Sequence, residues 1–219
     1  MKSIIVLSGG MDSTTALSWA LDQNHDVKCL LSFWYGSKHN DREWESACAV
    51  AEFYRLPIFR CRLDFIAELF KSDLLSTGDV IPEGHYADPS MKKTVVPFRN
   101  GIMVSIAAGF AESYEAEAIV LGNHFGDHAI YPDCRNQFIE PMRSAVKAGT
   151  YAQIELFSPF GDLSKADIVA LGTNLGTPYH LTYSCYNGRE NHCGKCGTCY
   201  ERKEAFSLAN VYDPTVYES

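Results

Sequence analysis

The sequence predicts an α/β protein: a parallel, Rossmann-like β-sheet covered by helices on both faces, followed by a small, metal-stapled helical module. Two observations predict this class. Short β-branched apolar runs alternate with amphipathic segments of helical spacing, which is the pattern of βαβ units. Four of the eight cysteines then gather at residues 185–199, where this alternation has stopped. A chain of 219 residues suits one domain with an appendage, so we expect a main domain over residues 1–176 and a module over 177–219.

The expected elements follow from hydropathy in chain order. Residues 4–7 are a β-branched run that stops at two glycines, so we expect a buried parallel strand. Residues 13–21 place Ala16, Leu17 and Ala20 on one helical face. Further strands are expected over residues 27–33, 58–63 and 118–121, and further helices over residues 43–56, 100–114 and 166–175. Residues 72–98 carry glycines and prolines with little periodicity, which predicts a long loop that is either functional or mobile.

Composition limits the possible functions. Nineteen basic against 27 acidic side chains give a net charge of −8, which disfavours a nucleic-acid binder because such proteins need a basic face. No apolar run approaches the roughly 18 residues of a membrane span, and residues 1–7 lack the features of a signal peptide. We therefore expect a cytoplasmic protein with reduced thiols, and neither a membrane nor a nucleic acid as its partner.

A glycine-rich turn, Ser8-Gly9-Gly10-Met11-Asp12-Ser13-Thr14, joins the first strand to the first helix. Glycines and hydroxyls at a helix start bind anions, because free amides and the positive end of the helix dipole point at them. Asp12 would repel a phosphate unless a cation intervenes, so it is a candidate Mg²⁺ ligand. The spacing matches neither Walker A nor Gly-x-Gly-x-x-Gly, and a plain tight turn is the alternative. The residues expected to bind a nucleotide here are Leu7, Ser8, Gly9, Gly10, Met11, Asp12, Ser13, Thr14, Thr15, Ala16 and Leu17.

Cys185, Cys193, Cys196 and Cys199 form the second motif. Four soft thiolates in a reducing compartment suit a tetrahedral Zn²⁺ ion. With no open ligand position, such a site would be structural, and the metal would stabilise a module too small to form a sufficient hydrophobic core. An iron–sulfur cluster is the rival interpretation, because cysteines separated by two residues also bind such clusters. A set in which His192 replaces Cys185 is a further alternative.

Several motifs together indicate a family. Residues 8–13 resemble the pyrophosphate loop of the ATP pyrophosphatases, the PP-loop or adenine nucleotide alpha hydrolase proteins, which cleave ATP between its α and β phosphates. Val-Val-Pro-Phe-Arg-Asn at 95–100, Tyr-Pro-Asp-Cys-Arg at 131–135 and Ser-Cys-Tyr-Asn-Gly at 184–188 follow in order before the cysteine cluster. The combination, which spans residues 4 to about 206, resembles the 7-cyano-7-deazaguanine synthase (QueC) family of queuosine-precursor enzymes.

This resemblance implies a ligase that converts 7-carboxy-7-deazaguanine and ammonia into the nitrile at the expense of ATP. It also implies Mg²⁺ beside the structural Zn²⁺, and a homodimer. Adenylation makes the carboxylate oxygen a good leaving group, so the protein supplies mainly positioning and electrostatic stabilisation. The residues expected to be catalytic are Asp12, Arg99, Arg135 and Lys165, and Lys38 and His39 at a strand end are further nucleotide contacts.

Two stretches depart from the pattern of the family. Phe98 stands where many members have Gly or Asn, and residues 122–128 differ from the family's Gly-Val-x-Glu-Thr-Asp. Either could line the substrate pocket. Within the second stretch, His124 and His128 flank Asp127 and could form a metal or acid–base site, or only line the pocket.

The acceptor of the activated carboxylate is also open at this point. A related ligase of the phage-defence type would join the carboxylate to a protein amine rather than to ammonia. A tRNA-thiolating relative would need a catalytic cysteine and a basic RNA-binding surface, which the charge of −8 disfavours. Cys134 beside Arg135 is the candidate thiol, although most lone cysteines are inert.

Overall fold

In a computed structural model of the chain, which describes residues 1–85, 88–124 and 130–218, the core is a five-stranded sheet of order β3-β2-β1-β4-β5. The strands are β1 (Lys2–Val6), β2 (Asp26–Trp34), β3 (Ile58–Arg62), β4 (Ala118–Val120) and β5 (Glu155–Phe157). Every pairing is parallel. The strand order reverses between β1 and β4, which is where open α/β sheets form a ligand crevice at their carboxyl edge.

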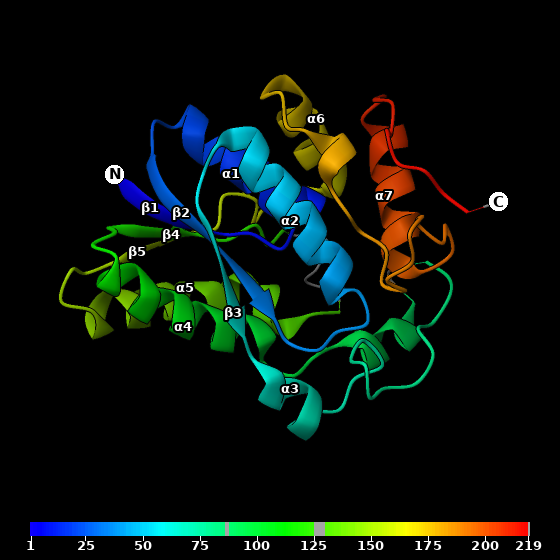
Figure 1. Cartoon of the computed structure of the whole chain (residues 1–219), viewed down its shortest axis with the longest axis horizontal. Helices are drawn as coiled ribbons and strands as arrows, with labels where there is room; N and C mark the ends of the chain where they lie inside the picture. The colour runs from blue at the N-terminus through cyan, green and yellow to red at the C-terminus, as the bar shows by residue number, and fades with distance from the viewer. Residues whose placement is uncertain (86–87, 125–129, 219) are drawn as a thin grey trace.

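Helices cover both faces of the sheet (Figure 1). On one face lie α1 (Met11–Asp22), α2 (Asn40–Tyr54) and α6 (Lys165–Asn174), and on the other lie α4 (Arg99–Ser113) and α5 (Asn136–Gly149). Successive side chains of a strand point to opposite faces. Ile5 and Leu7 therefore pack with the first group of helices, whereas Ile4 and Val6 pack with the second. The expected α/β class is confirmed.

Four elements were not expected from hydropathy: α3 (Asp64–Leu69), α5, β5 and α7 (Gly197–Leu208). Helix α5 carries Pro141 in its interior, and proline normally ends or kinks a helix. Its buried residues, Ile139 and Val146, are spaced as on one helical face, so a signal was present. The other elements agree with expectation to within a few residues at each end.

Helix α4 follows a 3-10 turn (Pro89–Thr94) within the segment that we expected to be a long loop. Together, Pro89–Ser113 is the one stretch of the described chain that is long and apolar enough to cross a membrane, judged by length and composition alone. Half of the most apolar 18 residues of this stretch are buried inside the fold. Its apolar residues are those of a core helix, because Val104 and Ala107 pack beneath the sheet.

The chain after residue 177 forms a 3-10 turn (Tyr179–Leu181), the cysteine-bearing loops and α7, which packs against α6. Arg202 of α7 is fully buried. Its guanidinium donates to the hydroxyl of Thr182 at 2.8 Å and to the carbonyl oxygen of Tyr179 at 3.2 Å, and it pairs with Asp213 at 3.1 Å. These bonds fasten the C-terminal segment together, and the boundary expected at residue 176 stays a prediction.

Candidate active site

A cleft of about 1120 Å³, counting the part open to solvent, lies at the carboxyl ends of β1, β2 and β4. Both halves of the chain contribute to its walls. Its lining includes Leu7, Ser8, Gly10, Met11, Asp12, Ser13, Tyr35, His39, Glu43, Arg99, Asn100, Asn123, Tyr131, Cys134, Lys165, Tyr183, Ser184, Tyr186, Thr198 and Glu201.

The glycine turn is held in one shape by close packing and by its own hydroxyl groups. Gly9 has a φ of +89°, and a Cβ placed on it would lie 2.4 Å from the carbonyl oxygen of Glu43. The hydroxyl of Ser8 accepts a hydrogen bond from the Gly10 amide at 3.2 Å, and the hydroxyl of Ser13 accepts one from the Ser8 amide at 3.2 Å. The first amides of α1 have no partner within the helix, so this turn can bind an anion.

The last four of the residues 7–17 that we expected to bind a nucleotide lie behind the wall of the cleft. The hydroxyls of Thr14 and Thr15 donate to the carbonyl oxygens of Gly10 and Met11, each at 2.8 Å, and both threonines are fully buried. Ala16 and Leu17 pack in the core. These four residues, like Gly9, support the turn and do not line the cleft.

Beside the turn lies a cluster that we call the charged end: Asp12, His124, Lys165 and Glu201. The ammonium of Lys165 lies 2.6 Å from Oδ2 of Asp12, 3.2 Å from Oε2 of Glu201 and 3.1 Å from Nε2 of His124. These residues come from the starts of α1 and α6, the segment after β4, and α7. Two predicted catalytic residues are thus brought together, and Glu201 joins them.

Asp12 also fits the expected cation. Its Oδ1 is buried and has no hydrogen-bond partner, although Oδ2 is paired with Lys165. An unsatisfied buried carboxylate oxygen is costly unless a cation or a donor meets it. A hard oxygen ligand beside an anion-binding turn is what Mg²⁺ requires.

At the opposite wall of the cleft, Arg99 lies among tyrosines, and we call Tyr35, Arg99, Tyr131 and Tyr186 the tyrosine end. Arg99 donates to the hydroxyl of Tyr35 at 3.3 Å, and its guanidinium lies 5.8 and 5.7 Å from the ring centres of Tyr35 and Tyr131. Burial alone would lower the pKa of Arg99, but the hydroxyls of these tyrosines and the carboxylate of Asp133 raise it above its ordinary value. The guanidinium therefore stays charged and can receive a planar anion.

The start of α4 is anchored by the Tyr-Pro-Asp-Cys-Arg motif. The carboxylate of Asp133 accepts a hydrogen bond from the Asn100 amide at 2.8 Å and so caps α4. The side-chain amide of Asn100 donates to the sulfur of Cys134 at 3.2 Å. This arrangement places Arg99 and brings Cys134, which is almost fully buried, to the wall of the cleft.

The remaining predicted residues separate into two groups. His39 lines the cleft, and its Nε2 lies 3.4 Å from the carboxylate of Glu43. Lys38 instead donates to the carbonyl oxygens of Asp73, Gly78 and Asp79 and so holds a surface loop. Arg135 is exposed and does not line the cleft that the described residues form. Asp127 and His128 lie outside the described residues.

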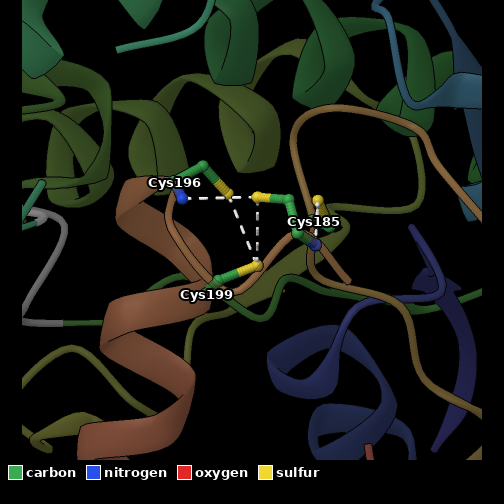
Figure 2. A group of neighbouring side chains, drawn as sticks. Cys185, Cys196 and Cys199 are labelled. Carbon is green, nitrogen blue, oxygen red and sulfur yellow. Dashed lines mark hydrogen bonds between the residues drawn. The ribbon is translucent and has the colours of Figure 1, made fainter. Parts of the chain in front are cut away.

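The thiol groups of Cys185, Cys193, Cys196 and Cys199 form a buried cluster before and at the start of α7. Figure 2 shows three of them, Cys185, Cys196 and Cys199. The four sulfur atoms lie within 4.8 Å of one another. Tetrahedral thiolates about 2.3 Å from one zinc ion would lie about 3.8 Å apart, and the observed Cys193–Cys199 and Cys196–Cys199 distances are 3.9 and 3.5 Å. The cluster can therefore hold one metal ion.

The thiols of the cluster are also hydrogen-bonded to one another. Hydrogen bonds from the thiols of Cys185 and Cys199 hold the pKa of Cys196 well below its ordinary value, whereas the hydrogen bond to Cys196 raises the pKa of Cys185. Four thiolates cannot coexist in this buried volume without positive charge. His192 does not belong to the group of close ligand atoms, which the four cysteines form, and its Nε2 accepts a hydrogen bond from the Ser184 amide at 2.9 Å.

Sequence reasoning missed Glu43, Glu201 and the role of Tyr186. Glu43 lies one helical turn after His39, which gave a signal, because residues four apart share a helix face. Glu201 lies just after the last cysteine, but nothing local shows that α7 turns this side toward β1 and β4. Tyr186 falls in the Ser-Cys-Tyr-Asn-Gly motif, whose position next to Arg99 depends on the fold.

Comparison with known proteins agrees with this geometry. The sequence profile described as Queuosine biosynthesis protein QueC matches residues 2–210. The 7-cyano-7-deazaguanine synthases of Porphyromonas gingivalis (strain ATCC 33277) and Desulfotalea psychrophila are 51% and 48% identical to this chain, covering 99% of it and 97% and 99% of their own lengths. A solved structure of NMN synthetase from Francisella tularensis shares the fold at 13% identity, with a TM-score of 0.50 over 100% of this chain and 88% of the other. The chain therefore belongs to the QueC family and is an enzyme of queuosine biosynthesis.

Proposed function

We propose that this enzyme is an ATP-dependent ligase that converts 7-carboxy-7-deazaguanine and ammonia into 7-cyano-7-deazaguanine. The observation that carries the proposal is that one cleft joins a glycine turn suited to anions to a partly buried arginine among tyrosines. The two ends suit the two partners of an adenylation: a nucleotide phosphate at the turn, and a flat heterocycle bearing a carboxylate at Arg99.

The chemistry needs two activations. The carboxylate oxygen attacks the α-phosphorus of ATP and expels pyrophosphate, giving an acyl adenylate. Ammonia attacks the carbonyl carbon and AMP leaves, giving the amide after loss of a proton. The amide oxygen then attacks the α-phosphorus of a second ATP and expels pyrophosphate, and loss of AMP and two protons from the adenylated amide leaves the nitrile.

The charged end serves both activations by the same means. The amides of the turn and the ammonium of Lys165 would stabilise the negative charge that develops on the phosphate oxygens. Asp12 would hold Mg²⁺, which when bound neutralises phosphate charge. No protein nucleophile is required, because the reacting oxygen belongs to the substrate.

At the tyrosine end, Arg99 would pair with the carboxylate, and the rings of Tyr35 and Tyr131 would flank the heterocycle. The fork of a guanidinium matches the two oxygens of a carboxylate. Arg135 remains a predicted contact to phosphate or carboxylate.

We assign Zn²⁺ to the four-cysteine cluster. The compactness of the sulfur atoms supports it, since in an iron–sulfur cluster each iron takes its own thiolate, which spreads the sulfurs further apart than one shared ion does.

We also propose a cytoplasmic homodimer. Free thiols at all eight cysteines suit a reducing compartment, and the exposed rings of Phe59 and Tyr114 at the edge strand β3 offer a contact face. Light scattering on the purified protein tests the dimer.

The deciding experiment incubates the enzyme with ATP, Mg²⁺, 7-carboxy-7-deazaguanine and ammonium. We expect AMP and the nitrile together, measured by chromatography and mass spectrometry. AMP without nitrile would favour transfer to another amine, such as a protein amine. A lack of AMP formation dependent on the carboxylate would refute the proposal.

A further inference from the structure

We propose that Glu201 is a positioning residue: it keeps the ammonium of Lys165 at the N-terminus of α1 when Asp12 turns to a cation. The inference rests on the proposed function, because it assumes that ATP binds with Mg²⁺ at this end of the cleft. It assigns a task to a carboxylate that comes from α7, outside the nucleotide-binding turn.

The geometry shows why a second carboxylate is needed. The ammonium of Lys165 bonds to Asp12 at 2.6 Å and to Glu201 at 3.2 Å at the same time. The two carboxylates are 20% and 11% exposed, and the lysine side chain is 14% exposed, so water screens these contacts only partly. His124, which is fully buried, adds its Nε2 at 3.1 Å from the same ammonium.

The charges then determine what happens when the ligand arrives. A cation placed at Asp12 competes with Lys165 for the Asp12 carboxylate, because both bind the same group. A second carboxylate in contact with the ammonium keeps this partly buried charge compensated, and an uncompensated charge would be costly there. Glu201 supplies that carboxylate, so Lys165 can exchange Asp12 for a phosphate oxygen without leaving the turn.

The thiolate cluster determines where Glu201 lies. Glu201 follows Cys199 by two residues in the first turns of α7, and Arg202 beside it is fully buried and hydrogen-bonded to Thr182. A metal at the cysteines would therefore fix the orientation of α7 about its axis and its position along that axis, as well as stabilise its fold. This links a metal site distant from the phosphates to the lysine that meets them.

The test compares Glu201→Gln with Glu204→Gln, a matched control on the same helix whose side chain is 56% exposed and paired with His85. In Glu201→Gln, Lys165 loses the carboxylate contact from α7 and holds Asp12 more tightly. We expect the half-saturating Mg²⁺ concentration to rise about tenfold and kcat to fall about tenfold. The KM for 7-carboxy-7-deazaguanine should stay unchanged, and Glu204→Gln should match the wild type.

A second measurement separates this inference from the proposed function. Calorimetric titration with a non-hydrolysable ATP analogue at several Mg²⁺ concentrations needs no turnover. In this titration, Glu201→Gln should show the same rise in the half-saturating Mg²⁺ concentration as in the kinetics. If the wild type makes no nitrile, the proposed function fails, but this titration still tests Glu201. Glu201→Gln kinetics equal to those of Glu204→Gln, or a uniform loss in every constant with a lower melting temperature, would overturn the inference. Partial recovery in Glu201→Asp would support it.

Discussion

The two ends of the cleft hold their cations in opposite ways. At the charged end, Lys165 is paired with two carboxylates, at 2.6 Å from Asp12 and 3.2 Å from Glu201. At the tyrosine end, Arg99 forms no ion pair with any carboxylate of the described residues and donates instead to the neutral hydroxyl of Tyr35 at 3.3 Å. Lys165 is held in direct ion pairs, whereas Arg99 is held by a hydroxyl and aromatic rings, with the carboxylate of Asp133 acting on it only from beyond ion-pair distance.

This difference in pairing indicates which end of the cleft must rearrange when a ligand binds. An anion reaching Arg99 replaces no existing ion pair, so binding there gains a charge-assisted bond directly. A phosphate reaching Lys165 competes with two carboxylates, so binding there depends on a cation to neutralise Asp12. Changes at the charged end should therefore affect ATP and Mg²⁺ use, and changes at the tyrosine end should affect the carboxylate substrate.

The largest effect should come from Asp12→Asn. The amide keeps the size of the side chain but cannot hold Mg²⁺, so we expect AMP release to fall about a thousandfold or more. The melting temperature should change by at most a few degrees, because the backbone of the turn is held by Gly9, Ser8 and Ser13. Asp22→Asn at the exposed end of the same helix is the control. Retained AMP release in Asp12→Asn would remove the metal role.

Cys196→Ser should produce the next largest loss. Without one of four thiolates, metal content measured by mass spectrometry should fall, and α7 should lose its anchor. We expect about a hundredfold lower turnover with a clearly lower melting temperature, because α7 carries Glu201 into the cleft. Cys48→Ser, at a partly buried cysteine outside the cluster, should behave as the wild type. A stable Cys196→Ser variant with full metal content would contradict the four-thiolate site.

Arg99→Lys tests whether the tyrosine end of the cleft binds the carboxylate substrate. Lysine keeps the charge but loses the planar fork, so the KM for 7-carboxy-7-deazaguanine should rise about tenfold to a hundredfold. The KM for ATP and the Mg²⁺ dependence should stay as in the wild type, measured by initial rates with each substrate varied. An equal rise in the KM for ATP would mean that the two ends do not bind separate partners.

The smallest effect should come from Tyr35→Phe. It removes the hydroxyl that accepts a hydrogen bond from Arg99 but keeps the ring. A net hydrogen bond contributes about 0.5–1.5 kcal/mol, so we expect a rise of about twofold to tenfold in the KM for the carboxylate substrate. Tyr212→Phe, at a residue 87% exposed and outside the cleft, is the control. A hundredfold effect would show that the hydroxyl contacts the substrate directly.

The parts of the site that could be predicted are those carried by short stretches of chain. The glycine turn needs only Gly9, Gly10 and the start of α1, because its anion-binding power comes from the backbone. The cysteine cluster is likewise local, since close spacing brings soft ligands together whatever surrounds them. The strand and helix pattern predicted the parallel sheet, because residues buried on both faces must be apolar.

Other roles could not be assigned from the sequence, because they depend on where distant segments meet. Lys38 and Arg135 are basic residues beside motifs, yet Lys38 binds loop carbonyls and Arg135 is exposed. Asp133 looks like an acid in a catalytic motif, and it caps α4. In each case the residue type permits several partners, and only three-dimensional contacts select one.

The sequence by itself determined the fold class, the anion-binding turn and the thiolate cluster, because each depends on interactions between near neighbours along the chain. Only the tertiary structure decided that Glu201 would share Lys165 with Asp12 and that Arg99 would lie among Tyr35 and Tyr131, outside ion-pair distance of the carboxylates that the structure describes. The reason is physical: the energy of a charge depends on burial and on the groups within a few ångströms, and the packing of α4, α6 and α7 sets both.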